Sequence, residues 1–279
     1  MHLFYFIYGK SGYALRSRFK IYYCALILLF SSSCLSVFAN TPKQESSFFN
    51  ICTTADYKPV IYKLPSGEFA GVAPDILNGF ANKEGLTIRF VVLSYNGLIP
   101  ALISNKCDII ATGMAATDER KKVIRFALGM YKSQSYIIYA KNNVKLKNPT
   151  SLQDFNKTNL VAGIGLGSIY DTFIHKNNPI PNSSIKIFDS ESDISTALLL
   201  DRVDFTFNGS QFLNSLTKSN PNRFSYIKLD ITNADIAFGL RKNEDTLLNK
   251  INSYIEELNK NGEHTRILEK NDVHFTAGY

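Results

Sequence analysis

Segments typical of strands and of helices alternate along most of this chain, and no other feature of the sequence constrains the fold as strongly. Strands alternating with helices predict parallel sheets with helices on both faces, which is an α/β fold. Ligands of such folds bind beyond the carboxyl ends of the strands. In the first half we predict strands at 48–54, 86–93 and 108–113, and helices at 74–85, ending at Gly85, and at 97–106.

The pattern starts again after a polar segment at 141–157, which is rich in Lys, Asn and Pro. This restart predicts a second α/β lobe. We expect strands at 159–165, 184–189 and 203–209, helices at 168–177 and 192–202, a returning strand at 235–242 and a helix at 245–262. An apolar stripe at helical spacing supports the last helix; it consists of Leu247, Leu248, Ile251, Ile255 and Leu258.

The first 39 residues have the composition of a secretory signal peptide. They carry four basic and no acidic residues, a short apolar core at 21–30 and a serine-rich end. We expect cleavage after Ala39, a mature chain beginning at Asn40, and a periplasmic protein. Lipid attachment at Cys34 is the alternative, although three serines precede this cysteine.

Removal of this segment changes the charge argument. The full chain has 31 basic and 24 acidic residues, and loss of four basic residues leaves 27 against 24, or +3. A surplus of this size gives no reason to expect a nucleic-acid partner. The hydrophobic content of 45% in 279 residues fits two lobes of globular protein.

The cysteines and histidines give little evidence of a special site. Cys52 and Cys107 remain after cleavage, and export permits a disulfide, but their offset along neighbouring strands leaves the bridge open. The histidines, which lie at 2, 175, 264 and 274, have no metal-ligand spacing. We therefore expect no metal and no cofactor.

The stretch "DIIATGMAATDERKK" (108–122) raises the question of a ligand. Small residues follow a predicted strand, so the backbone N–H groups of Gly113, Met114 and Ala115 are open to an anion. Arg120 follows, and arginine matches a carboxylate with two parallel hydrogen bonds. The alternative is a solvated turn that begins a helix, and this stretch alone leaves both interpretations open.

Together with its neighbours, this stretch resembles the polar amino-acid family of periplasmic solute-binding proteins that serve ABC importers. The resemblance follows the family's order over the mature chain, in "TADYKPV", "GEFAGVAPDIL", "LVAGIGLGS", "DRVDFTF" and residues 97–141 and 236–268. It implies a type II periplasmic binding protein, in which two crossing strands join two Rossmann-like lobes. By analogy the first lobe is 48–137 plus 238–279 and the second is 138–237. The implied partners are a small ligand and a permease, and the implied state is a monomer.

The resemblance also implies roles for individual residues. Arg120 matches the arginine that binds the ligand's α-carboxylate. Other positions match the surroundings of that carboxylate or the aromatic pair beside the ligand's side chain; they are Thr112, Gly113, Met114, Ala115, Gly167, Ser168, Tyr57 and Tyr95.

Two acids that the family uses for the ligand's ammonium group are missing. Their positions are Thr54 and Gly209, the latter preceded by Asn208. An enclosed ammonium group without a carboxylate partner is costly. We expect Asp235 to replace the missing acids, with Asp56 and Asp171 as further candidates.

Two other functions stay open. "CTTADYKP" and "NKCDI" also resemble periplasmic cyclohexadienyl dehydratases on the same fold, but "NGSQFLNS" (208–215) lacks the general acid that dehydration needs. A ligand sensor is the other alternative. The sequence favours a binding protein for a small carboxylate-bearing solute, an amino acid or a derivative, with no catalytic residues.

Overall fold

The structure is a computed structural model that describes residues 48–273, except for the side chains of residues 232–234. The predicted signal peptide, its cleavage after Ala39 and the alternative lipid site at Cys34 lie outside the described residues. Within the described range, no helix is both long and apolar enough to cross a membrane.

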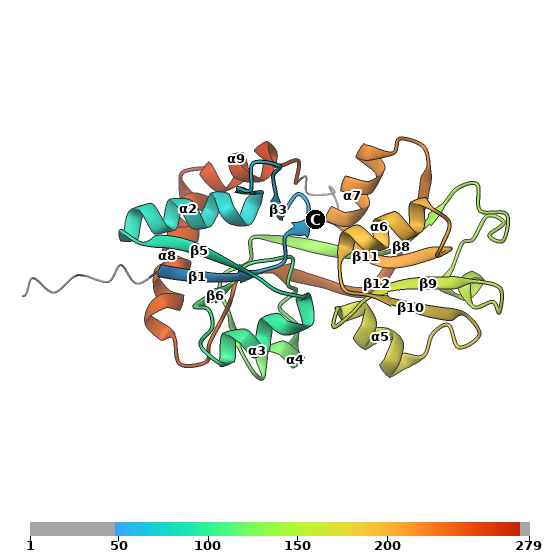
Figure 1. The fold of residues 1–279 in the computed structure, drawn as a ribbon, viewed down its shortest axis with the longest axis horizontal. Helices are drawn as coiled ribbons and strands as arrows, with labels where there is room; N and C mark the ends of the chain where they lie inside the picture. The colour runs from blue at the N-terminus through green and yellow to red at the C-terminus, as the bar shows by residue number, and fades with distance from the viewer. Residues whose placement is uncertain (1–47, 274–279) are drawn as a thin grey trace, which may run out of the picture. The chain divides into compact units, whose positions relative to one another are not determined.

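The first sheet has the strand order β5-β1-β6-β13-β7 (Figure 1). Its strands are β5 (Thr87–Val92), β1 (Phe48–Thr53), β6 (Ile109–Ile110), β13 (Gly239–Leu240) and β7 (Arg125–Phe126). β1 pairs in parallel with β5 and β6, and β13 pairs antiparallel with β6 and β7. The helices of this part are α2 (Val72–Glu84), α3 (Leu98–Ile103), α4 (Asp118–Lys121), α8 (Asp245–Lys260) and α9 (Glu263–Lys270).

Alternating side chains of β1 explain why helices cover both faces of this sheet. Phe49 and Ile51 join the core beneath α2, α8 and α9, whereas Cys52 joins the core beneath α3. Successive side chains of a strand point to opposite faces, so a single strand contributes to both cores. Cys52 forms a disulfide with Cys107, at a Cα–Cα distance of 5.6 Å. The chain bends enough before β6 to bring Cys107 within reach, and this resolves the question that the sequence left open.

The second sheet has the strand order β10-β9-β11-β8-β12. Its strands are β10 (Ser184–Phe188), β9 (Val161–Gly165), β11 (Phe205–Gly209), β8 (Tyr131–Ala140) and β12 (Phe224–Ile236). α5 (Ile169–Asn177) packs on one face, over a core that includes Phe155, Phe205 and Phe207. α6 (Glu191–Leu199) and α7 (Ser210–Ser219) pack on the other face.

Two long strands connect the cores of these sheets. β8 and β12 pair antiparallel along almost their whole length, with a register shift between Leu229 and Asn233. Tyr131 and Ile236, at one end of the pair, belong to the core under the first sheet, and Tyr139 and Phe224, at the other end, belong to the cores of the second. We call the part built on the first sheet the first lobe and the part built on the second sheet the second lobe. The residue boundaries at 137/138 and 237/238 stay a prediction.

The main predicted elements are confirmed, with differences at their ends. α2 ends at Gly85 as expected, and α8 buries most of the predicted stripe. The expected strand at 108–113 is only Ile109–Ile110. The expected returning strand at 235–242 is divided between the end of β12, at Ile236, and β13. The pattern of strands and helices did not indicate β7, β8, the greater part of β12, α7, α9, the short helices η1 (Tyr95–Gly97) and η2 (Leu152–Phe155), or a small sheet of β2 (Asp56–Tyr57), β3 (Ile61–Lys63) and β4 (Phe69–Ala70).

Candidate ligand-binding site

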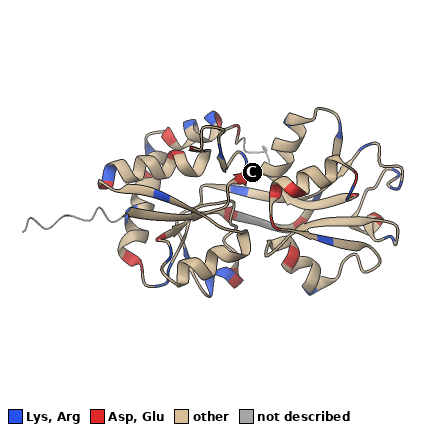
Figure 2. Cartoon of the chain, in the orientation of Figure 1, with Lys and Arg blue, Asp and Glu red and all other residues tan. Residues whose placement is uncertain are grey.

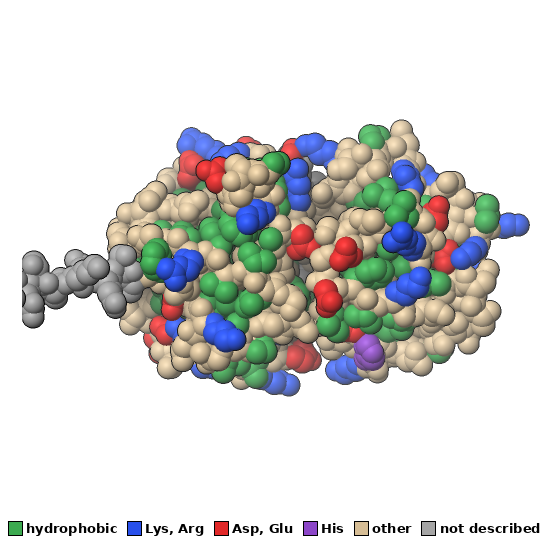
Figure 3. Space-filling model, viewed as in Figure 1, with side chains coloured by type: hydrophobic (Ala, Val, Ile, Leu, Met, Phe, Trp, Pro, Cys, Tyr) green, Lys and Arg blue, Asp and Glu red, His purple; other side chains and the backbone are tan. Residues whose placement is uncertain are grey.

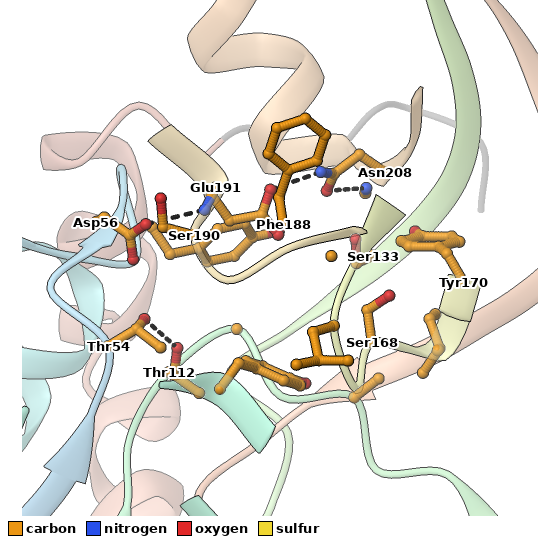
Figure 4. Close-up of a pocket in the computed structure, with 18 of the residues that line it drawn as sticks. Thr54, Asp56, Thr112, Ser133, Ser168, Tyr170, Phe188, Ser190, Glu191 and Asn208 are labelled. Atoms are coloured by element: carbon orange, nitrogen blue, oxygen red, sulfur yellow. Dashed lines mark hydrogen bonds between the residues drawn. The ribbon is translucent and has the colours of Figure 1, made fainter. Parts of the chain in front are cut away.

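A cavity lies between the first and the second lobe, and most of the predicted site residues line it (Figure 4). About 70 Å³ of it is open to the centre of a water molecule. One water needs roughly 10–15 Å³ on this measure, so the space suits a small metabolite. The predicted residues on its walls are Thr54, Tyr57, Tyr95, Thr112, Gly113, Ala115, Arg120, Ser168 and Asn208.

Arg120 joins the two lobes at one side of the cavity. Nη1 donates to the carbonyl oxygen of Ala115 at 2.9 Å, in the first lobe, and Nη2 donates to that of Gly167 at 3.2 Å, in the second. The guanidinium carbon also lies 5.5 Å from the ring centre of Tyr95. Arginine has five N–H donors, so these two bonds orient the group and leave donors for a ligand. The arrangement fits a carboxylate placed next to Arg120.

Hydroxyl groups and exposed backbone complete this side. Thr54 Oγ1 and Thr112 Oγ1 lie 3.1 Å apart at the carboxyl ends of β1 and β6. At Gly113 the backbone approaches an aromatic ring, because a Cβ there would lie 2.1 Å from Cε1 of Tyr57. Ser168 begins α5 from the second lobe, and its hydroxyl accepts a hydrogen bond from the N–H of Asp171 at 3.1 Å. A helix N-terminus favours a negative charge, so this end of α5 is a suitable place for an anion.

Carboxyl groups gather on the other side of the cavity. Glu191, the first residue of α6, accepts a hydrogen bond from Nδ2 of Asn208 at 2.6 Å. Burial raises the pKa of the Glu191 carboxyl to about 7; the hydrogen bond from Asn208 lowers it and the charge of Asp56 raises it further. Asp56 comes from β2 of the first lobe, and its carboxylate accepts the N–H of Glu191 at 2.9 Å. This contact is a second link between the lobes, which are closed on each other around the cavity.

Comparison with known proteins agrees with this geometry. The family model of the bacterial extracellular solute-binding proteins, family 3, matches residues 49–272, which is most of the chain. The chain belongs to this family. It is 26% identical over 225 residues to a probable histidine-binding protein of Campylobacter jejuni, covering 79% of this chain and 83% of the relative.

Solved structures of the same fold lead to the same family. An ancestral arginine-binding protein bound to arginine has a TM-score of 0.73 at 28% identity and covers 80% of this chain and 97% of its own. The ancestral amino acid-binding protein AncCDT-1, a precursor of cyclohexadienyl dehydratase, has a TM-score of 0.72 at 26% identity over 80% of this chain and 95% of its own. Both have the two-lobed architecture of type II periplasmic binding proteins, which this chain shares.

In this family 3 protein, hydroxyl groups crowd the position of Gly209, so an acid there would require the Ser133 hydroxyl to move. A Cβ at that position would lie 2.7 Å from Ser133 Oγ and 3.4 Å from the hydroxyl of Tyr57. The hydroxyl of Tyr170 would lie 3.7 Å away. Three hydroxyl groups therefore surround the position where the resemblance implies an aspartate. Burial raises the pKa of both tyrosines well above the ordinary value, so they stay neutral.

Three predicted site residues lie elsewhere. Met114 is buried in the core under α3, and Gly167 meets Arg120 at the edge of the cavity without lining it. The expectation that Asp235 replaces the missing acids is wrong. Its neighbour Ile236 faces the cavity, and successive side chains on a strand point in opposite directions, so Asp235 is exposed to solvent.

The sequence interpretation missed Glu191, the acid that the structure brings into the cavity. Of the two reserve candidates, Asp56 lines the cavity, whereas Asp171 accepts the N–H of Gly167 beneath it. A signal for Glu191 was present, because it follows the carboxyl end of β10 and opens the next helix, where α/β folds bind ligands. No group of three His, Cys, Asp or Glu side chains within residues 48–273 is placed to hold a metal ion.

Proposed function

We propose that this protein is the periplasmic binding component of an amino-acid importer of the ABC type and that it acts without catalysis. The observation that carries the proposal is Arg120, a cation held by carbonyl groups of both lobes at the wall of a small closed cavity. A carboxylate bound there contacts both lobes at once. It therefore binds the closed form better than the open form, and ligand occupancy shifts the population toward closure.

An amino acid is the class of ligand that matches the cavity. Arg120 and Ser168 suit the carboxylate, and the acid side with Asp56 and Glu191 suits a positive charge. The relatives support this assignment, since their names record histidine and arginine as ligands. The proposal includes export to the periplasm with cleavage of the signal peptide after Ala39. It also includes a separate permease that receives the ligand from this protein.

The test is isothermal titration calorimetry of the mature protein with a panel of L-amino acids. We expect at least one to bind at a single site, and Arg120→Ala to weaken it by at least about 100-fold, because a charged hydrogen-bonded pair is lost. Lys122→Ala is the matched control, since Lys122 is an exposed cation at the end of the same helix. Equal affinities of the wild type and Arg120→Ala contradict the proposal.

Dehydration of a prephenate-like ring is a second candidate, favoured by one observation. Glu191 is a carboxyl group in the cavity whose pKa is raised to about 7, and a general acid works best when its pKa is near the operating pH. Incubation with prephenate tests it directly. Formation of phenylpyruvate that is abolished by Glu191→Gln would establish the enzyme. If prephenate is not turned over, the dehydratase candidate is rejected and the binding-protein proposal stands.

A further inference from the structure

The charges on the cavity wall do not balance. Among the described lining residues there is one cation, Arg120, and there are three carboxyl groups, those of Asp56, Asp189 and Glu191. An amino acid with a neutral side chain brings one negative and one positive charge. Its carboxylate matches Arg120, and its ammonium group offsets only part of the acidic charge. The surplus matches a ligand with a second positive charge.

We propose that Glu191, supported by Asp56, binds a cationic side chain of the ligand and thereby selects basic amino acids. This proposal rests on the proposed function and names the class of solute for the same cavity. It assigns the selectivity to the start of α6, away from the two positions at which the resemblance implies acids.

Glu191 is oriented by a fixed neighbour. Asn208 is almost completely buried, and its Oδ1 accepts the N–H of Gly209 at 2.7 Å. Since the carbonyl end of the amide is used in this way, the NH₂ end is the one that meets Glu191, at Oε2. The hydrogen bond holds the carboxyl group on the cavity wall with its other oxygen available. A pre-oriented carboxylate binds a cation with little loss of side-chain freedom.

The position of Glu191 matches a side chain better than the α-ammonium group. Ser168 and Arg120 define the carboxylate end of the cavity, and Figure 4 shows Glu191 and Asp56 on the opposite side from Ser168. An amino acid with its carboxylate at Arg120 directs its distal atoms toward Glu191. Figure 2 shows acidic residues at the start of α6, and Figure 3 shows acidic side chains along the gap between the lobes.

The Asp56 contact connects this recognition with closure. Its Oδ2 accepts the N–H of Glu191 at 2.9 Å and lies 3.4 Å from the N–H of Ser192. Asp56 belongs to the first lobe and the two N–H groups to the second, so the second carboxylate reaches Glu191 when the lobes meet. The cationic side chain of a ligand offsets the repulsion between the two carboxylates, which favours the closed form.

Two pairs of ligands of similar size test the proposal by calorimetry at pH 8: L-arginine against L-citrulline, and L-lysine against L-norleucine. We expect the wild type to bind the cationic member of each pair at least about 100-fold more tightly. In Glu191→Gln the cationic ligands should weaken by at least about 30-fold and the neutral ones by less than about 3-fold. Asp193→Asn is the matched control, an exposed acid in the first turn of the same helix, and should keep the preference.

The outcomes separate this proposal from the proposed function. A cationic preference that survives Glu191→Gln overturns the role of Glu191, and tight binding of neutral or acidic amino acids alone overturns the solute class. In both cases the amino-acid importer stands. Binding of no amino acid by the wild type overturns the importer and this inference together. Thermal unfolding of each variant shows that it is folded.

Discussion

The two walls of the cavity differ in how closely their residues match those that the family resemblance implies. The first-lobe wall has Thr112 and Gly113 soon after β6 and Arg120 in α4, in the order that the family resemblance implies. The second-lobe wall departs from that order, with Gly209 in place of an acid and Glu191 as an acid in another place. The comparison indicates that the proposed carboxylate end depends on a local motif, whereas the proposed cation end depends on charges that several separate elements supply.

The walls also differ in how they are braced. Cys52 precedes the threonines at the end of β1, and Cys107 precedes β6, which leads to the carboxylate end. Their disulfide therefore ties together the two strands that carry this wall. Among the described residues the second lobe has no disulfide. Its core depends on packed aromatic rings such as those of Phe155 and Phe205, whose ring centres lie 4.8 Å apart.

The largest effect that we predict is the loss of unfolding free energy when this disulfide is removed. The double variant Cys52→Ala/Cys107→Ala should unfold more easily by about 4 kcal/mol, because the disulfide spans 55 residues and restricts the unfolded chain. Urea unfolding followed by circular dichroism measures the difference. The wild type in reducing agent should show the same loss. An unchanged midpoint in both cases would contradict a bracing role for the bond in the first lobe.

The second-largest effect concerns the acid on the other wall. Glu191 has a pKa of about 7 in the folded protein against an ordinary 4.5, so the folded state binds more protons between these values. Stability contributed by this group is therefore present at low pH and is lost as the pH rises through 7. Gln at this position cannot ionise. Without ligand, Glu191→Gln should be more stable than the wild type by about 1 to 3 kcal/mol at pH 8, with no difference near pH 4.5.

Thermal unfolding of the unliganded proteins at the two pH values tests this expectation. Asp193→Asn serves as the control, because it removes an exposed acid from the same helix turn. A variant Glu191→Gln that is less stable than the wild type at pH 8 would show that the carboxylate is satisfied without a ligand. A gain in stability would indicate that the wall is built for binding a cation at the expense of the unliganded fold.

The contrast between the walls also explains what the sequence could predict. Arg120, Thr112 and Ser168 were found because each follows the carboxyl end of a strand within a recognisable motif. Asp235 was placed wrongly, because its direction depends on the pairing of β12 with β8, which the sequence does not contain. Glu191 was missed because its role depends on Asn208 and Asp56, which are 17 and 135 residues away along the chain.

The same reason applies to the fold. The periodic segments of α2 and α8 predict their helices from local sequence. β6 has only two residues, and β2 to β4 have two or three, so their assignment depends on neighbours that only the folded chain supplies. β8 passes from one core to the other, and its residues from Ser135 to Ala140 are all buried, which removes the simple alternation of buried and exposed residues there.

The smallest predicted effect sharpens the comparison by means of pH. A cationic side chain binds the ionised form of Glu191. The groups that interact with this carboxyl are Asp56 from β2, Asn208 from β11 and three tyrosines, Tyr57, Tyr95 and Tyr170. With a pKa of about 7, most of the Glu191 population is protonated at pH 5.5. Affinity for L-arginine should therefore fall by up to about 30-fold between pH 8 and pH 5.5. At the lower pH, binding of the ligand should release a proton from the Glu191 carboxyl.

Titrations of L-arginine at several pH values measure how the affinity of the wild type depends on pH. Glu191→Gln should bind L-arginine weakly, and its affinity should change little over the same pH range. The carboxylate at Arg120 gives no such slope, since arginine stays charged throughout. A steep pH dependence of the affinity in both proteins would mean that another residue titrates. It would then contradict the assignment of the pH response to the second-lobe wall. A slope present only in the wild type assigns the pH response to the second-lobe wall, through the same carboxyl group that we propose selects the ligand.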